Sequence, residues 1–116
     1  MEKILVVDDE RGLREVMSIM LKRAGYIVTE ASDGEEAIGF IGKEIFDLVI
    51  TDLRMAEMDG IALLRELQRR WPGLNVIMLT AHGTIPDAVK ATQSGAFAFL
   101  TKPVEKEQLL EEVRRA

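Results

Sequence analysis

Five side chains that could form a metal and phosphoryl site each stand at or near the end of a short apolar segment. They are Asp8, Asp9, Asp52, Thr80 and Lys102. Short apolar runs that end in polar residues predict β-strands, and the carboxyl ends of parallel strands share one edge of a sheet. We therefore expect three carboxylates, a hydroxyl and an ammonium group to converge there. Such a set predicts a site for a divalent cation and a phosphoryl group.

The adjacent acids Asp8 and Asp9 are the strongest part of this pattern. An acid after a strand often caps the next helix, which is the ordinary interpretation of either one. The pair is harder to explain in that way, because neighbouring carboxylates repel each other unless a cation lies between them. Mg²⁺ prefers oxygen ligands and binds through one or two carboxylates and several waters. Asp52, alone an ordinary loop acid, follows another predicted strand and completes the cluster.

Thr80 and Lys102 differ in how strongly they indicate a phosphoryl site. Thr80 is weak evidence by itself, since a threonine at a strand end commonly bonds to nearby backbone. Lys102 offers a compact positive charge to a phosphate, and Pro103 allows a cis turn that would aim it; the alternative is a surface lysine before a helix. His82 is the only histidine. Beside Gly83 it is better explained as a solvated loop residue than as a metal ligand.

The elements that would position these groups alternate five times between strand-like and helix-like patterns. Strands are predicted at 4–7, 26–31, 48–50, 75–79 and 97–101. The first is continuously apolar, as in a strand buried on both faces, whereas the second alternates and suits a sheet edge. Repeated βα units predict a parallel sheet with helices on both faces. Periodicity does not give the strand order.

Helix boundaries follow from capping and turn residues. Ser32-Asp33-Gly34-Glu35 reads as a capping box that opens the second helix. Other helix ends are marked by Gly25, Asp59, Gly73, Thr84 and Gly95. Helical spacing predicts that the first helix turns one face inward, formed by Leu13, Val16, Met17, Met20 and Leu21.

Composition limits the possible classes of function. The chain has 116 residues, which fits a single domain over 1–116, and it is 47% hydrophobic and 30% charged. A net charge of −5 argues against direct binding of nucleic acid by this domain. The chain has no cysteine, which excludes disulfides and thiolate metal sites. No apolar stretch is long enough to span a membrane, and the N-terminus lacks the build of a signal peptide. We expect a cytoplasmic location and no membrane partner.

The sequence resembles the receiver domains of two-component response regulators along its whole length. VVDDE, D-L-R-M with M-D-G, L-T-A and T-K-P occur in that order. The resemblance implies a flavodoxin-like (βα)5 three-layer sandwich with a parallel five-stranded sheet in the order 2-1-3-4-5. It implies that Asp52 accepts a phosphoryl group and that Asp8, Asp9, Asp52 and the Arg54 backbone carbonyl surround Mg²⁺. It also implies phosphoryl contacts from Thr80 and Lys102.

The resemblance extends to partners and to signalling. It implies a phosphorylated switch rather than an enzyme, with a sensor histidine kinase or a small acyl phosphate as phosphoryl donor. Thr80 and Phe99 fall on the family's switch positions, although Phe99 could equally be a plain core aromatic. The resemblance also implies a homodimer, formed through the fourth helix, the fifth strand and the fifth helix or, as the less favoured alternative, through the first and fifth helices. HGTIPDAVKATQSGAFAFLTKP further resembles NtrC-like activators of sigma-54-dependent promoters, which implies an output domain for transcription. Ala56 replaces the usual proline.

Four other classes of protein share parts of this pattern. A stand-alone receiver would regulate a partner protein instead of its own output domain. A flavodoxin-like FMN carrier would need a Ser/Thr/Gly-rich loop after the first strand, where this chain has DDERG. A haloacid-dehalogenase-like phosphatase would carry its acids as D-x-D, whereas here they are adjacent. A metal-free pseudo-receiver is disfavoured because every site residue is present.

Overall fold

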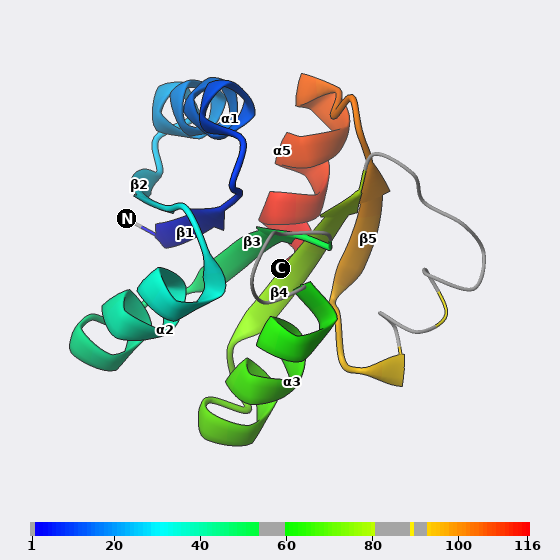
Figure 1. Ribbon diagram of the computed structural model, residues 1–116. Helices are drawn as coiled ribbons and strands as arrows, with labels where there is room; N and C mark the ends of the chain where they lie inside the picture. The colour runs from blue at the N-terminus through cyan, green and yellow to red at the C-terminus, as the bar shows by residue number, and fades with distance from the viewer. Residues whose placement is uncertain (1, 54–59, 81–88, 90–92) are drawn as a thin grey trace.

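The protein forms one five-stranded parallel sheet covered by helices on both faces (Figure 1). The computed structural model describes residues 2–53, 60–80, 89 and 93–116. The strand order is β2-β1-β3-β4-β5, as expected from the resemblance to receiver domains. The strands are β1 (Lys3–Val7), β2 (Ile27–Ala31), β3 (Leu48–Asp52), β4 (Asn75–Thr80) and β5 (Ala98–Thr101). β2 lies at a sheet edge, which confirms the prediction made from its alternating pattern.

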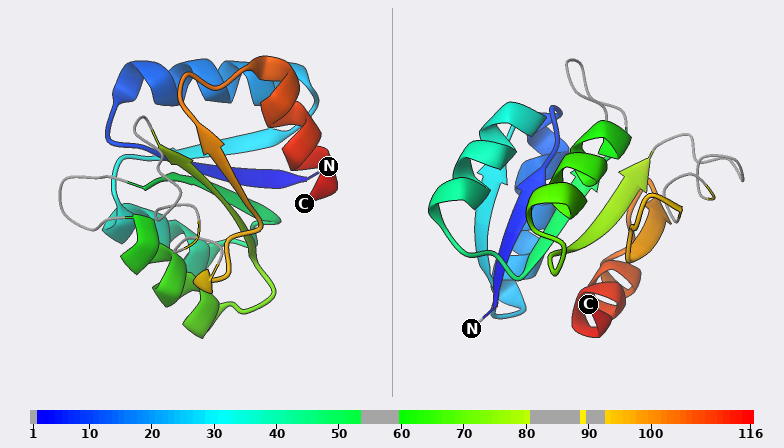
Figure 2. Two further views of the ribbon diagram at one scale, coloured as in Figure 1. Left: turned by 90° about the vertical axis from the view of Figure 1, so that its right-hand side faces the viewer. Right: turned by 90° about the horizontal axis from the view of Figure 1, so that it is seen from below.

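The described helices form a layer on each side of the sheet (Figures 1 and 2). One layer holds α1 (Arg11–Arg23) and α5 (Lys106–Arg115), and the other holds α2 (Gly34–Lys43) and α3 (Gly60–Arg70). None of the helices within the described residues is long and apolar enough to cross a membrane.

Alternating strand residues divide the core into two clusters. Ile4 and Val6 pack with α1 and α5, whereas Leu5 and Val7 pack with α2 and α3. All four are fully buried, because β1 lies inside the sheet with helices on both faces. This alternation continues to the strand ends and therefore decides the side on which each polar residue emerges.

The first helix differs from its predicted inward face at one position. Met17 and Leu21 are buried as expected, but Val16 is 52% exposed. Ser18 is buried instead, and its hydroxyl has no hydrogen-bond partner among the described residues. The apolar spacing predicted the helix correctly, but the face that is actually buried is rotated about the helix axis, so that it includes Ser18 and leaves out Val16. Gly25 follows the helix with φ +100, a conformation that favours glycine.

The capping box of the second helix is shifted by one residue from the prediction. Asp33 is the N-cap, and its side chain accepts a hydrogen bond from the backbone N–H of Glu36 at 2.8 Å. Glu36 in turn accepts from the backbone N–H of Ser32 at 3.0 Å. Asp33 with Glu36 therefore replaces the predicted pair of Ser32 with Glu35. An aspartate one position later makes an equally good cap.

Candidate functional site

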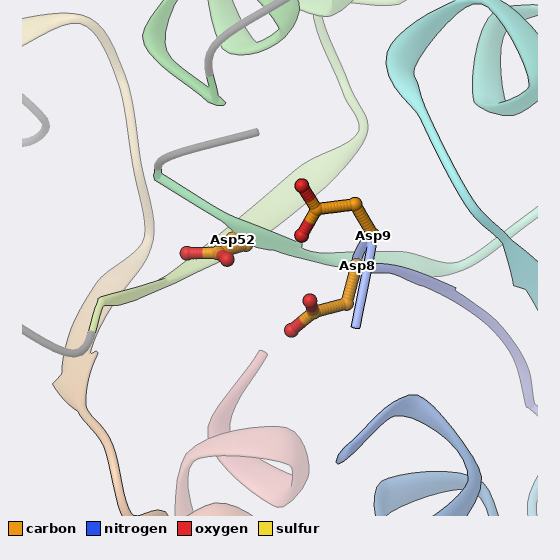
Figure 3. A group of neighbouring side chains, drawn as sticks. All are labelled: Asp8, Asp9 and Asp52. Atoms are coloured by element: carbon orange, nitrogen blue, oxygen red, sulfur yellow. The ribbon is translucent and has the colours of Figure 1, made fainter. Parts of the chain in front are cut away.

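The predicted polar residues gather where β1, β3 and β4 end. Asp8 and Asp9 directly follow β1, Asp52 is the last residue of β3 and Thr80 is the last of β4. Parallel pairing aligns these ends: Val7 lies opposite Thr51, and Asp52 lies opposite Leu79. Figure 3 shows Asp8, Asp9 and Asp52 together at this edge of the sheet.

Asp8 is fixed by contacts on all its polar atoms. Its backbone N–H donates to the Ala31 carbonyl at 3.1 Å, and its backbone carbonyl accepts from Arg14 at 2.7 Å. One carboxylate oxygen accepts from the Glu10 backbone N–H at 2.9 Å. The other accepts from the Lys102 ammonium, also at 2.9 Å. With an exposure of 0%, Asp8 is a buried, fully bonded carboxylate.

Lys102 joins two of the three acids. Its Nζ donates to Asp8 at 2.9 Å and to Asp52 at 3.0 Å, and its side chain is only 11% exposed. Burial lowers the pKa of Lys102, but the hydrogen bonds and charges of Asp8 and Asp52 outweigh burial and raise it above its usual value. The ammonium group is therefore held charged and acts as an internal counter-ion for two buried carboxylates. The Lys102–Pro103 peptide bond is cis.

Asp9 differs from Asp8 because it is exposed. Successive residues at the end of β1 point to opposite sides, and Figure 3 shows the two carboxylates diverging. Asp8 therefore turns toward α1, α5 and Lys102, and Asp9 turns the other way. Within the described part of the chain, no hydrogen bond or ion pair holds the Asp9 carboxylate.

The three acids fit a divalent cation. One carboxylate oxygen from each of Asp8, Asp9 and Asp52 lies within 4.8 Å of the other two. Hard oxygen donors at such a spacing match the preference of Mg²⁺. Because Lys102 already bonds Asp8 and Asp52, the exposed Asp9 carboxylate is the most accessible of the three acids to a cation.

Thr80 and Phe99 occupy neighbouring strands. Thr80 is fully buried, and its backbone carbonyl accepts from the Lys102 N–H at 2.7 Å. This bond links the end of β4 to the residue that carries the counter-ion. Phe99, on β5 opposite Met78, is half-buried against the core on the α2 and α3 side.

Gly60 packs against the backbone of Asp52 and Leu53, next to the acidic cluster, and the sequence did not predict this contact. Its backbone N–H donates to the Leu53 carbonyl at 2.7 Å. A Cβ at Gly60 would lie 2.2 Å from the Asp52 carbonyl oxygen and 2.7 Å from Met78. Only glycine fits this approach, so the start of α3 and the end of β3 are packed backbone to backbone.

Several predicted residues lie outside the described residues. They are Arg54, Ala56, Asp59, His82, Thr84 and Pro86. The predictions made for them, including the Arg54 carbonyl ligand and most of the fourth helix, stay predictions.

Comparison with known proteins supports the resemblance to receiver domains. Residues 4–114 match the response regulator receiver domain family. The transcriptional regulatory protein GlrR of Escherichia coli is 51% identical over 110 residues, covering 95% of this chain and 25% of GlrR. The response regulator protein PilR of Pseudomonas aeruginosa is 40% identical over 115 residues, covering 99% of this chain and 26% of PilR. The chain thus spans about a quarter of the length of these relatives.

Solved structures agree with the sequence comparison. A response regulator receiver domain from Clostridium thermocellum superposes with a TM-score of 0.94 at 34% identity, covering 99% of this chain and 93% of that one. Chemotaxis protein CheY4 of Vibrio cholerae gives a TM-score of 0.94 at 32% identity, with 99% and 98% coverage. The sheet order, the acidic cluster at its edge and these matches together show that the chain belongs to the receiver domain family of two-component response regulators.

Proposed function

We propose that Asp52 accepts a phosphoryl group from a phosphohistidine on a sensor histidine kinase, or from a small acyl phosphate. The observation that carries the proposal is the Lys102 ammonium, which bonds Asp52 and Asp8 at 3.0 and 2.9 Å. A nearly buried lysine beside the acceptor supplies positive charge where phosphoryl oxygens would arrive. The family match supports this assignment.

The reaction forms one bond and breaks one. An Asp52 carboxylate oxygen attacks phosphorus, and the bond from phosphorus to the donor's imidazole nitrogen or acyl oxygen breaks, with its electron pair leaving on the donor. A carboxylate is a modest nucleophile, so positioning and charge neutralisation do most of the work. The Lys102 ammonium would face the arriving phosphoryl oxygens, and the Thr80 hydroxyl would donate a hydrogen bond to one of them.

The acidic cluster would hold Mg²⁺ through Asp9, Asp52 and the Arg54 backbone carbonyl, with Asp8 acting through water. When bound, Mg²⁺ supplies charge neutralisation to the phosphoryl group. The exposure of Asp9 and the full bonding of Asp8 support this division between the two acids.

Phosphorylation would act as a switch between two conformations. Thr80 and Phe99 would link the site to the face formed by the fourth predicted helix, β5 and α5. This face would mediate homodimer formation. Relatives named as transcriptional regulatory proteins, such as GlrR, are about four times as long as this chain, which supports an NtrC-like output domain acting on transcription. The domain would work in the cytoplasm without contacting nucleic acid itself.

A stand-alone receiver that regulates a partner protein is the second candidate. CheY4 of Vibrio cholerae, which is named a chemotaxis protein and not a transcriptional regulator, supports it. The two candidates share the same site and differ only in what the switch controls.

Intact-mass measurement after incubation with acetyl phosphate and MgCl₂ tests the proposal. We expect wild type to gain the mass of one phosphoryl group, labile to hydroxylamine, and Asp52→Asn to gain none, because an amide is no nucleophile. Asp47→Asn is the matched control, since Asp47 is an exposed acid at the opposite end of the sheet. Equal labelling of Asp52→Asn and wild type would contradict the proposal.

Mg²⁺ titration separates the two adjacent acids. Asp9→Ala should weaken binding more than Asp8→Ala, because Asp9 is the proposed direct ligand. Unchanged Mg²⁺ affinity in both variants would contradict the assignment of the metal site.

A further inference from the structure

Arg14 contacts the peptide unit that connects the two adjacent acids. It lies in α1, and its side chain is only 15% exposed. Its Nη1 donates to the Asp8 backbone carbonyl at 2.7 Å. Its Nε donates to Glu30 on β2 at 3.1 Å. The guanidinium group is therefore held by Glu30 while it binds the end of β1.

The Asp8 carbonyl controls the direction in which Asp9 leaves the strand. The carbonyl oxygen of one residue and the nitrogen of the next belong to one planar peptide unit. Fixing the Asp8 oxygen therefore fixes the plane from which Asp9 departs. No hydrogen bond among the described residues holds the Asp9 carboxylate. Its direction depends on the backbone that Arg14 restrains.

We infer that Arg14 is a positioning residue that presents Asp9 to Mg²⁺, with Glu30 orienting Arg14. The inference rests on the proposed function, because it assigns Asp9 as a metal ligand. A planar guanidinium can bond two acceptors in a fixed geometry, which the single ammonium of lysine does not reproduce. Residues that orient metal ligands commonly change metal affinity when they are replaced.

Electrostatics alone predicts the opposite effect of removing Arg14. A positive charge near three carboxylates repels Mg²⁺, so its removal would tighten binding. Loss of positioning would weaken binding. The sign of the change in affinity therefore distinguishes the two roles. Arg14→Lys sharpens the test, because it keeps the charge and loses the forked geometry.

The experiment titrates MgCl₂ into metal-free protein by calorimetry. Wild type is compared with Arg14→Ala and Arg14→Lys, and with the matched control Arg11→Ala. Arg11 lies on the same helix and pairs with Glu15, but its side chain is 82% exposed and does not contact the acidic cluster. We expect about tenfold weaker binding for both Arg14 variants and less than about a twofold change for the control.

A second readout needs no metal. Nitrogen-15 relaxation of the Asp9 amide in metal-free protein should show greater mobility in both Arg14 variants and unchanged mobility in Arg11→Ala. Arg14→Lys carries the test if Arg14→Ala does not fold, because lysine retains a long buried stem and the charge.

The outcomes separate the two proposals. If wild type binds no Mg²⁺, the proposed function and this inference both fail. If wild type binds Mg²⁺ and the Arg14 variants bind it as tightly or more tightly, only the positioning role is overturned. An equal loss in Arg11→Ala, which removes no bond to the Asp8 carbonyl, would show that the loss does not depend on the contact made by Arg14, and it would also overturn the positioning role.

Discussion

Replacing Lys102 with methionine should destabilise the metal-free protein by about 3 kcal/mol. The change keeps the long apolar stem and removes the charge that bonds Asp8 and Asp52. Both carboxylates are nearly inaccessible, with residue exposures of 0% and 6%. Removing one partner of a buried ion pair costs about 3–5 kcal/mol, because the remaining charge is buried without compensation.

The lower end of that range applies here. The Lys102 side chain is 11% and the Asp52 side chain 9% exposed, so water can partly solvate the acids after the substitution. A loss of about 3 kcal/mol leaves a domain of ordinary stability folded. The change should therefore be measurable at equilibrium.

Urea denaturation in EDTA measures the effect, and Lys106→Met is the matched control. Lys106 is an exposed lysine four residues further along, where the same substitution should change stability by less than about 0.5 kcal/mol. Adding MgCl₂ should stabilise Lys102→Met more than wild type, because the cation can then neutralise carboxylates that the ammonium no longer occupies.

Equal stability of Lys102→Met and Lys106→Met in EDTA would refute this reasoning. It would mean that the two carboxylates are satisfied without Lys102. An equal response of wild type and Lys102→Met to MgCl₂ would show that the ammonium and the metal do not share the same charges.

Three further predictions concern stability. The ion pairs of Lys102 with Asp8 and Asp52 raise the lysine pKa. Their contribution to the free energy of unfolding is therefore complete below the unfolded lysine pKa of about 10.4 and is lost as pH rises through the folded pKa. Above pH ~10.4 the urea midpoint of wild type should fall more than that of Lys102→Met. Ser18→Ala should stabilise the protein by about 1 kcal/mol, because the buried hydroxyl has no partner in the part of the chain that the structure describes. An unchanged or lower melting temperature would contradict this. Gly60→Ala should cost about 3 kcal/mol through its contact with the Asp52 carbonyl, whereas the control Gly39→Ala, with nothing within 4 Å, should be neutral or stabilising in urea.

The sequence was sufficient to predict the strands and the convergence of the site. Each strand combines an apolar run with a polar residue at its end, and parallel βα topology brings those ends together. The alternation of strand side chains between the two faces of the sheet also indicates the side on which each acid emerges. Asp8 follows Val6 at even spacing, and Asp52 follows Ile50 in the same way, so both emerge on the side of α5 and Lys102. Asp9 falls on the other side.

Details of helix packing were less predictable. The apolar side chain of Val16 suggested burial, but the helix turns Ser18 inward instead. Hydrophobic spacing defines a face only to within a fraction of a turn, and the sheet surface beneath decides the final rotation. The cap shifted from Ser32 to Asp33 because both side chains can accept the same type of bond.

Close backbone contacts could not be predicted from spacing. Gly60 opens α3, and its position in the sequence does not indicate that it contacts the strand that carries Asp52. Arg14 is a polar residue of α1, and its position in the sequence does not indicate that it bonds the Asp8 carbonyl. Both roles depend on contacts between elements that are distant in sequence, and side-chain type alone does not report such contacts.

The long reach of Lys102 has a consequence for the order of events during synthesis. The lysine follows Asp8 by 94 positions and Asp52 by 50. A ribosome releases both acids well before their counter-ion, and domains form as units while the chain emerges. Until Lys102 appears, closing the sheet edge would bury two unneutralised carboxylates. A nascent chain should therefore keep this edge open and hydrated, and the last strand and helix complete the charge balance as well as the sheet.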